Sequence, residues 1–488
     1  MTDLPFRSAT QLAQAIRDKE ISSLELTDLY IERIEQYDEV LNAVVVRCFD
    51  QAREAARAAD ELLGRDRSLR PLHGLPVTIK EAYNLEGTPT TWGVPELKDN
   101  VAARDAETVR RLKAAGAHFL GKTNVPLNLA DFQSFNKIYG TTNNPWRTGC
   151  TPGGSSGGSA AALAAGLTAL EAGSDIGGSI RNPAHFCGIY GHKPTWGVVS
   201  GEGHTLPGIV SPADIAVVGP MARRAEDLTL ALNVVAGADA FDAQGWTLQL
   251  PRPEKTSLKA FRVAVWPTDD LAPVSAEVAD RVQTVADTLA RLGATVSDSA
   301  RPPFADYGLT LKDTLDTYES LLWGVLSAAA PEVTHQSLKK RAAALATDDK
   351  SVRARALRCS TQDHREWVFH NNRRFLIRLA WRAFFEDWDI LICPQMPTAA
   401  FPHDHSAYFD RTLTFDGRTI EYLAQINWAG LITVAHLPST VFPTGPSSEG
   451  LPIGLQAVGK EFDDYVTIDF CRLLAVEIGG FVAPPGFT

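Results

Sequence analysis

The first sixty residues carry apolar side chains at helical spacing. Ser8 and Ser22 each stand three positions before a glutamine or a glutamate, which is the pattern of a capping box at a helix start. The apolar stripe of the second run has members three or four positions apart: Leu26, Leu29, Tyr30, Ile34 and Tyr37. A third run follows Asp50, with alanines and leucines on one stripe. We therefore predict three amphipathic helices in this segment.

The pattern then changes to short runs of apolar and β-branched residues. Residues 75–80 and 117–122 predict two buried strands. Residues 105–116 between them predict a helix, because this run begins with acidic residues and ends at a glycine. The strand–helix–strand order predicts a central, largely buried sheet with helices packed on it. Residues 159–167 are nearly all small, which predicts a helix close to its neighbours in the middle of the fold.

The second half of the chain repeats this alternation. Residues 261–266 predict a strand, residues 275–292 a helix, and residues 309–386 a mostly helical subdomain rich in arginine and aromatic side chains. Three further strands are predicted at residues 389–394, 431–435 and 452–459. Residues 251–257 are the best candidate for a loop between lobes. We expect one large α/β domain with a helical subdomain, not a string of separate domains.

The composition is that of a soluble globular protein, with 44% hydrophobic and 22% charged residues among 488. A net charge of −11 disfavours a nucleic-acid groove, which needs clustered lysine and arginine. No leader segment and no apolar run of about 18 residues is visible, so we expect a cytoplasmic protein without a membrane segment. The six cysteines form no C-x-x-C pair, which predicts reduced thiols and not a zinc site or a disulfide framework.

Residues 153–159, GGSSGGS, are rich in glycine and serine. The simplest interpretation is a flexible turn. A phosphate cradle is disfavoured because the stretch lacks the lysine of the G-x-x-x-x-G-K-[ST] motif. The stretch also matches the G-x-S-x-G elbow of α/β hydrolases formally. That elbow requires a strand directly before the serine, whereas the preceding NNPWRTGCTP contains two prolines and no β-branched run.

A second glycine-wrapped serine follows 24 residues after the first. Gly177 and Gly178 precede Ser179, and consecutive glycines allow backbone conformations that other residues avoid. Successive N–H groups can then converge on one point and bind an oxygen anion. A serine at the end of such a loop lies where an acyl carbon would be attacked, although a plain tight turn would have the same sequence.

Lys80 ends the predicted strand at residues 75–80. A lysine in this position usually extends to the surface. To act as a base it would have to be uncharged, and its pKa would have to fall from about 10.4 to near 7. Burial without a carboxylate partner could cause that fall. Serine and lysine together can transfer acyl groups without histidine, metal or organic cofactor, so we interpret the chain as a serine hydrolase acting on amide-type bonds.

Histidine offers competing hypotheses. His185 and His192 follow Ser179 closely, but histidines held by hydrogen bonds after the serine are a simpler interpretation than a serine–histidine pair. His403 and His405 stand two positions apart without a third ligand nearby. They indicate a loop at a substrate entrance more than a metal site. We expect no metal and no cofactor.

Five stretches together match a known family: HGLPVTIKE, GKTNVP, GTTNNPW, TPGGSSGGSAAALAAG and GSDIGGSIRNPAHFCGIYGHKPT. The sequence resembles the amidase signature family of serine hydrolases, which includes fatty acid amide hydrolase and the glutaminase subunit of tRNA-dependent amidotransferases. A weaker likeness extends to GLPIGLQAVG, so nearly the whole chain is covered. The two serines 24 positions apart, each in a glycine-rich stretch, make the match highly specific.

The resemblance implies a single domain, residues 1–488, built on a large central mixed β-sheet flanked by helices on both faces. Residues 1–70 would form the N-terminal helices and residues 71–250 the catalytic core. Residues 258–488 would add the remaining strands, together with a helical subdomain at about 309–386 that shapes the substrate pocket.

The resemblance also implies the catalytic roles. Ser179 is the expected nucleophile, Lys80 the expected base, and Ser155 the serine that bridges them after a cis peptide bond. The expected oxyanion hole is formed by four backbone N–H groups, those of Ile176, Gly177, Gly178 and Ser179.

Three further residues are expected to support this arrangement. We expect Ser156 to hold the geometry by hydrogen bonding. We also expect Asp175 and Arg181 to pair and brace the loop.

The substrate is less well defined by the sequence. The segment after GKTNVP often lines the acyl pocket in the family, and here it offers Leu129, Phe132 and Phe135. Many members carry glutamate where Leu127 stands, so this chain departs from the common pattern. An apolar lining would suit acyl or aryl amides, anilides, carbamates or esters better than free amino-acid amides.

Three functional hypotheses follow. The first is a free-standing amidase for a small-molecule amide, active as a monomer or homodimer. The second is the glutaminase subunit of a tRNA-dependent amidotransferase. No convincing R-R-I-M-L-G-like stretch is present, however, and Asn182 stands where that subunit often has glutamine. The third is a non-catalytic binding protein of the same fold, which is disfavoured because all three polar positions are intact.

Overall fold

The computed structural model describes residues 4–65 and 70–487. The described residues leave out 1–3 and 66–69, which belong to the predicted N-terminal segment 1–70. They also leave out residue 488, which ends the predicted segment 258–488. Among the described residues, no helix combines the length and the apolar character that a membrane crossing requires.

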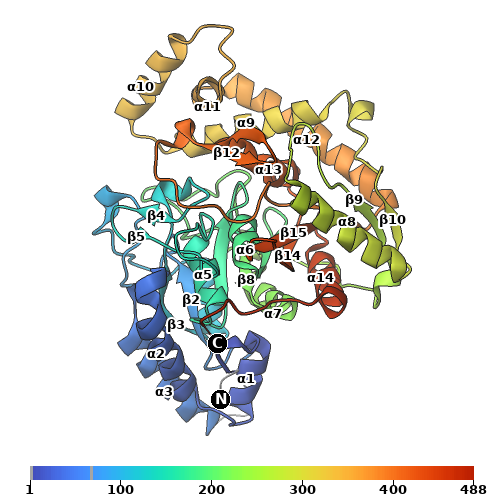
Figure 1. The fold of residues 1–488 in the computed structure, drawn as a ribbon. Helices are drawn as coiled ribbons and strands as arrows, with labels where there is room; N and C mark the ends of the chain where they lie inside the picture. The colour runs from blue at the N-terminus through green and yellow to red at the C-terminus, as the bar shows by residue number, and fades with distance from the viewer. Residues whose placement is uncertain (1–3, 66–69, 488) are drawn as a thin grey trace.

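An eight-stranded mixed sheet forms the centre of the molecule (Figure 1). Its strands, in spatial order, are β10 (Thr295–Ser297), β9 (Arg262–Val265), β11 (Ile390–Pro394), β15 (Pro452–Val458), β14 (Ser439–Pro446), β7 (Tyr190–Lys193), β8 (Val217–Ala222) and β6 (Glu171–Asp175). The β10–β9 and β9–β11 pairs are parallel, and every later pair is antiparallel. The predicted strands at residues 261–266, 389–394 and 452–459 correspond to β9, β11 and β15.

Helices cover both faces of this sheet. Along β11, Ile390 and Ile392 belong to one hydrophobic core, while Leu391 and Cys393 belong to another. Because successive strand side chains point to opposite faces, both faces of β11 are buried. The helices that contribute to the first core include α7 (Ala225–Val235), α8 (Ala276–Arg291) and α14 (Asp464–Ile478). The expected α/β class, with a mixed sheet between two helical layers, is confirmed.

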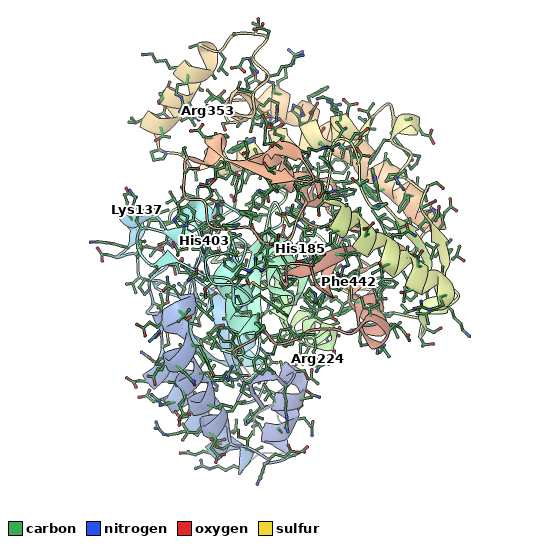
Figure 2. The ribbon with its side chains drawn as sticks, viewed as in Figure 1. Lys137, His185, Arg224, Arg353, His403 and Phe442 are labelled. Atoms are coloured by element: carbon green, nitrogen blue, oxygen red, sulfur yellow. The ribbon has the colours of Figure 1, made fainter. Side chains whose placement is uncertain are left out.

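A helical segment rises above the second core. It consists of α9 (Leu311–Ala328), α10 (Glu332–Ala343), α11 (Val352–Cys359) and α12 (His364–Asp387). Arg353 of α11 lies near its upper end, far from the N-terminal helices (Figure 2). Helices α9 and α12 pack on each other and contribute Tyr318 and Trp381 to the second core. The helical content predicted for residues 309–386 is confirmed.

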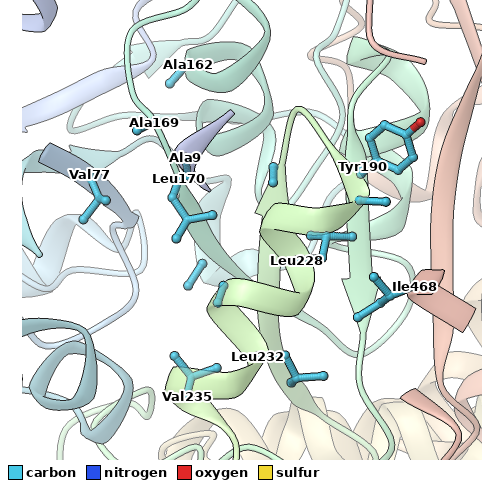
Figure 3. Packing of buried hydrophobic residues seen from close by; sticks show 14 of the residues in the cluster. Ala9, Val77, Ala162, Ala169, Leu170, Tyr190, Leu228, Leu232, Val235 and Ile468 are labelled. Carbon is cyan, nitrogen blue, oxygen red and sulfur yellow. The ribbon is translucent and has the colours of Figure 1, made fainter. Parts of the chain in front are cut away.

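The N-terminal helices are α1 (Ala9–Arg17), α2 (Ser23–Leu41) and α3 (Phe49–Leu63). Ser8 and Ser22 form the predicted capping boxes with Gln11 and Glu25. The helices pack against the large core that also holds Val77, Leu170 and Leu232 (Figure 3). The three predicted amphipathic helices therefore form at their expected places.

A separate three-stranded sheet carries β2 (Pro76–Lys80) between the N-terminal helices and the large sheet. The spatial order is β1 (Val44–Arg47), β3 (His118–Thr123) and β2, with β2 parallel to β3 and β1 antiparallel to it. Helix α4 (Glu107–Ala114) connects β2 to β3, as predicted. The prediction that these strands belong to the central sheet was wrong, because a strand pattern does not specify the neighbouring strand: β2 packs beside β6 without joining its ladder.

One strand prediction was also wrong. Residues 431–433 belong to helix α13 (Asn427–Thr433), and the strand of this region is β14. Leu431 and Ile432 are buried in the second core. A short apolar run fits a buried helix as well as a buried strand, so the pattern could not separate the two.

The remaining α-helices and strands are short. They are α5 (Gly157–Ala164), α6 (Arg181–Cys187), and the two-stranded ribbons β4 (Phe135–Asn136) with β5 (Gly140–Thr141) and β12 (Thr412–Phe415) with β13 (Arg418–Glu421). Helix α5 is buried along its whole length and packs against β2, β3 and β6, as its small side chains predict. The Gly/Ser stretch that begins α5 therefore lies beside the end of β2.

Candidate active site

Lys80 ends β2 with its side chain fully buried. Its Nζ lies 2.6 Å from Ser155 Oγ, 2.9 Å from Ser156 Oγ and 2.8 Å from Ser174 Oγ. The hydroxyls come from the Gly/Ser stretch before α5 and from β6. The predicted contact between Lys80 and Ser155 therefore forms, and Lys80 does not extend to the surface.

The enclosure of Lys80 changes its protonation. Burial lowers the pKa of Lys80 from 10.5 to about 7, against the opposing charges of Asp175 and Glu171. Near neutral pH a substantial fraction of the amine is therefore uncharged. An uncharged amine has two N–H donors and one lone pair, so among three hydroxyls it can donate two hydrogen bonds and accept one.

Ser155 follows a cis peptide bond from Gly154, as the resemblance implied. The Gly154 N–H donates to Asn182 Oδ1 over 2.9 Å, and the Gly154 backbone packs against the backbone of Asp131 and Gln133. The Ser156 N–H donates to the Ser179 carbonyl over 3.1 Å. This bond places the two serine-bearing stretches side by side.

Asp175 organises the loop that carries Ser179. Its carboxylate accepts hydrogen bonds from the N–H groups of Gly178 (2.8 Å) and Ile180 (3.1 Å), and it pairs with Arg181 over 2.9 Å. Burial alone would raise the pKa of Asp175, but the Arg181 guanidinium and these donors lower it to about 2. The expected Asp175–Arg181 pair is present, and Ser179 lies within this clamp with 8% of its surface exposed.

The backbone donors of the expected oxyanion hole are only partly available. The Gly178 N–H is bound to Asp175, so this group is not the free donor that we expected. Within the part of the chain that the structure describes, the N–H groups of Ile176, Gly177 and Ser179 make no hydrogen bond. These three remain the candidate donors.

The glycines of this loop are needed for space as well as for conformation. Gly178 has a φ of +103°, and a Cβ there would lie 2.8 Å from the Gln395 side-chain nitrogen. A Cβ on Gly177 would lie 2.6 Å from Ile426 and 2.7 Å from the Tyr318 hydroxyl. Side chains from α9, the segment after β11 and the segment before α13 thus cover the loop.

The three predicted pocket residues separate in the structure. Phe132 is buried in a small apolar cluster, and Ile426 packs against the same cluster. Phe132 is thereby connected to the covering of Gly177. Phe135 instead stacks on His405 with 4.0 Å between ring centroids, and Leu129 is half-buried in a left-handed backbone conformation.

The histidines do not approach Ser179 as a catalytic base would. His185 lies in the middle of the molecule (Figure 2), with its ring nitrogens 2.6 Å from the Gly454 carbonyl and 3.0 Å from the Thr398 carbonyl. Burial lowers the pKa of His185 to about 4. His192 contacts Thr440 and Asp464. Among the described residues, no group of three or more His, Cys, Asp or Glu side chains could hold a metal ion.

Sequence reasoning missed Ser174 and the side chains that cover the glycines. Ser174 could have been found, because it directly precedes Asp175 in the same glycine-rich stretch. Tyr318 donates from its hydroxyl to the Ile176 carbonyl over 3.0 Å from a helix 142 positions away. No local pattern marks Tyr318, Gln395 or Ile426, since only the folded chain brings them to the loop.

Comparisons with known proteins identify the family of the chain. A family model described as Amidase matches residues 25–468. A glutamyl-tRNA(Gln) amidotransferase component from Anaeromyxobacter dehalogenans is 34% identical over 96% of this chain and 95% of its own length. Indoleacetamide hydrolase of Bradyrhizobium diazoefficiens is 33% identical over 95% of this chain and 84% of its own. The crystal structure of a bacterial aryl acylamidase of the amidase signature family superposes with a TM-score of 0.81, at 25% identity over 96% of both chains.

Proposed function

We propose that this chain, which belongs to the amidase family, hydrolyses the carbon–nitrogen bond of small amides through an acyl-enzyme on Ser179. The observation that carries the proposal is the 2.6 Å contact between the buried Lys80 amine and the Ser155 hydroxyl. Ser155 directly precedes Ser156, whose N–H donates to the Ser179 carbonyl. A buried amine with a pKa of about 7 supplies a base without histidine or metal.

The proposed acylation begins with proton transfer from Ser179 through Ser155 to Lys80. The Lys80–Ser155 contact is formed in the structure, whereas among the described residues no hydrogen bond joins the hydroxyls of Ser155 and Ser179. Uncharged Lys80 accepts the Ser155 hydroxyl proton while Ser155 accepts the proton of Ser179, and Ser179 Oγ bonds to the carbonyl carbon of the substrate. When the carbon–nitrogen bond breaks, Ser155 passes a proton to the departing nitrogen and recovers one from Lys80. The amine leaves neutral, and the acyl group stays on Ser179.

The negative charge on the substrate oxygen needs fixed donors. The N–H groups of Ile176, Gly177 and Ser179 are proposed for this role, since Gly178 is engaged with Asp175. Each such donor is worth about 10²–10³ in rate when it is placed in advance. Water then gives its proton to the same relay and attacks the acyl carbon, which releases the acid and regenerates Ser179.

The side chains that cover Gly177 and Gly178 favour a substrate with an uncharged acyl or aryl group. Tyr318, Ile426, Gln395 and Ala429 contact the glycine pair, and all four side chains are uncharged. The carboxylate of a free amino acid would find no counter-ion among them. We therefore propose acyl or aryl amides as substrates, with carbamates and esters as further candidates, and Phe132 as part of the pocket wall.

The second candidate function is the glutaminase subunit of a tRNA-dependent amidotransferase. It is favoured by the 34% identity to a glutamyl-tRNA(Gln) amidotransferase component over 96% of this chain. The purified chain, tested alone on p-nitroacetanilide and on glutamine, separates the two. Hydrolysis of the anilide without added partners supports the first function. Turnover of glutamine alone would support the second.

The partners and location follow from the first function as proposals. A small-molecule amide would be the only partner required for turnover, and the protein would act in the cytoplasm as a monomer or homodimer. Sedimentation of the active preparation tests the oligomeric state.

A further inference from the structure

The outer face of α12 carries apolar side chains that the proposed reaction does not use. The inner face of this helix, with Ile377 and Trp381, is buried in the second core. On the outer face, Val368, Phe375 and Leu379 keep 47%, 50% and 43% of their surface exposed. Helices at a protein surface ordinarily turn polar side chains outward, so this face is unusual.

Helix α8 shows the ordinary pattern in the same molecule. Its exposed positions include Asp280, Gln283, Thr284 and Asp287, all of which are polar. The apolar outer face of α12 is therefore not a general property of the surface helices in this chain. Exposed apolar side chains gathered on one face are typical of a surface that binds a partner.

The exposed positions of α12 follow one regular spacing. Steps of three and four residues alternate along a line of exposed side chains, which we call the α12 stripe: Arg365, Val368, Asn372, Phe375, Leu379, Arg382 and Glu386. This alternation is the spacing of the side chains that meet where two helices pack along each other. The charged members stand toward the two ends of the stripe, and the apolar members and the asparagine stand between them.

The charges of the stripe determine which way a second copy of α12 would run. In a parallel pair, Arg365 would face Arg365 and Glu386 would face Glu386, and like charges disfavour such a pair. In an antiparallel pair, each Arg365 faces a Glu386. Arg382 then lies opposite Val368, over which its methylene groups can pack. Phe375 lies at the middle of the stripe, so it meets Phe375 of the second copy close to the two-fold axis.

A groove beside the stripe extends the contact surface. Phe375, Leu379 and Arg382 line it together with Phe462, which is 44% exposed, and its volume is about 370 Å³. In the antiparallel arrangement, Val368 of the second copy lies next to this half of α12. Each copy would therefore both offer and receive the same side chains, which is the property of a dimer interface that closes on itself.

We propose that the α12 stripe is the interface of a homodimer, in which two copies of this chain pair antiparallel along α12. The inference is independent of the proposed amide hydrolysis, because none of the proposed catalytic residues belongs to the stripe. A membrane is the alternative partner for exposed phenylalanine and leucine side chains. The exposed carboxylates of Glu386 and Asp387 at one end of the helix, and the net charge of −11, disfavour an anionic lipid surface.

Phe375→Asp tests the interface by sedimentation velocity over a dilution series, in which we expect the wild type to sediment as a dimer. The substitution acts twice in each dimer and places two carboxylates together at the axis. A loss of roughly 30-fold for each copy gives a dissociation constant about 1,000-fold higher. The matched control is Phe241→Asp, at a phenylalanine outside the stripe that is 85% exposed, and it should leave the dimer unchanged. A monomeric wild type, or a Phe375→Asp variant that stays dimeric, would overturn the inference.

A charge exchange tests the antiparallel orientation. Arg365→Glu places a carboxylate against Glu386 of the second copy, and we expect it to weaken the dimer about tenfold over the two equivalent contacts. Adding Glu386→Arg restores the attraction, so the double variant should return to the wild-type dissociation constant. A parallel pair would give no such recovery. A double variant as weak as Arg365→Glu alone would therefore overturn the proposed pairing.

A covalent cross-link gives a measurement that does not depend on weakening the dimer. Phe375→Cys should form a disulfide between two copies when copper phenanthroline is added as the oxidant, and Phe241→Cys should not. Five of the six native cysteines are buried and Cys359 is partly buried, so the added thiol is the accessible one. Failure of Phe375→Cys to cross-link would overturn the inference. A monomeric wild type that sediments with phosphatidylserine vesicles would overturn it too, and would assign the stripe to a membrane.

Discussion

Lys80→Met is the most informative perturbation of the proposed base. Methionine retains an unbranched chain in the buried site but removes the amine that contacts Ser155. With a pKa of about 7, about half of the wild-type amine is uncharged at pH 7, against about 3 in 10,000 for a pKa of 10.5. Burial therefore increases the supply of base by about 1,500-fold, which corresponds to about 4 kcal/mol.

The assay is kcat/KM for p-nitroacetanilide between pH 5 and 9. We expect the wild-type value to rise tenfold per pH unit below about 7 and to level above it. Lys80→Met should lose about 10³ of the plateau rate and the acid limb with it. A variant that keeps a limb with the same midpoint would refute Lys80 as the base.

The same variant has a stability signature. Because the pKa of Lys80 is lowered on folding, the unfolded state binds more protons between about pH 7 and 10.5. Wild-type stability should therefore rise with pH across that window, whereas Lys80→Met should not share the rise. The melting temperature of the variant relative to wild type should then fall as pH increases, and a difference that does not change with pH would contradict a buried, uncharged amine.

The remaining predictions concern the loop and the absence of a metal requirement. Ser179→Ala should lower turnover below detection with an unchanged circular-dichroism spectrum, and substantial remaining activity would reject the nucleophile. Asp175→Asn leaves the buried Arg181 without its counter-ion, so we expect a loss of about 3–5 kcal/mol in the free energy of unfolding, measured in urea; a loss under about 1 kcal/mol would contradict this role. Gly178→Ala should reduce kcat about 100-fold, because φ is +103° and the new methyl would lie 2.8 Å from Gln395; a wild-type kcat would show that the loop tolerates a side chain. EDTA should leave the rate unchanged, and inhibition that zinc reverses would revive a metal site at His403 and His405.

The catalytic residues could be predicted where the neighbouring sequence indicates their role. Ser155 and Ser179 stand in glycine-rich stretches, and Lys80 ends an apolar strand, so a short sequence pattern identifies each of them. Only the family resemblance indicated that the three residues belong to one site. The structure adds the distance between Lys80 and Ser155 and the enclosure that lowers the pKa of the amine.

The parts that sequence reasoning missed depend on contacts between distant segments. The sequence predicted the Gly178 N–H as a donor to the oxyanion. Whether this N–H is free depends on the position of the Asp175 carboxylate, which only the folded chain fixes. Tyr318 and Ile426 reach the loop from elements far along the chain, and their sequence neighbourhoods are ordinary. Short-range patterns contain no information about such pairings.

In the fold, too, local features could be predicted from the sequence and the pairing of distant strands could not. Capping boxes at Ser8 and Ser22 act within four residues, and both form. The identity of neighbouring strands is a long-range property, so the prediction that β2 belongs to the central sheet was wrong. Leu431 shows the other limit, since a buried apolar run of five residues fits a helix as well as a strand.

Ser179 is proposed to form the acyl-enzyme, with Lys80 as the base that receives its proton through Ser155. Reaction of the purified protein with a fluorophosphonate, followed by peptide mass mapping, tests it most directly. We expect one label, on Ser179, at a rate that rises with pH through about 7 and falls by orders of magnitude in Lys80→Met. A label on Ser155 or Ser156 would contradict it.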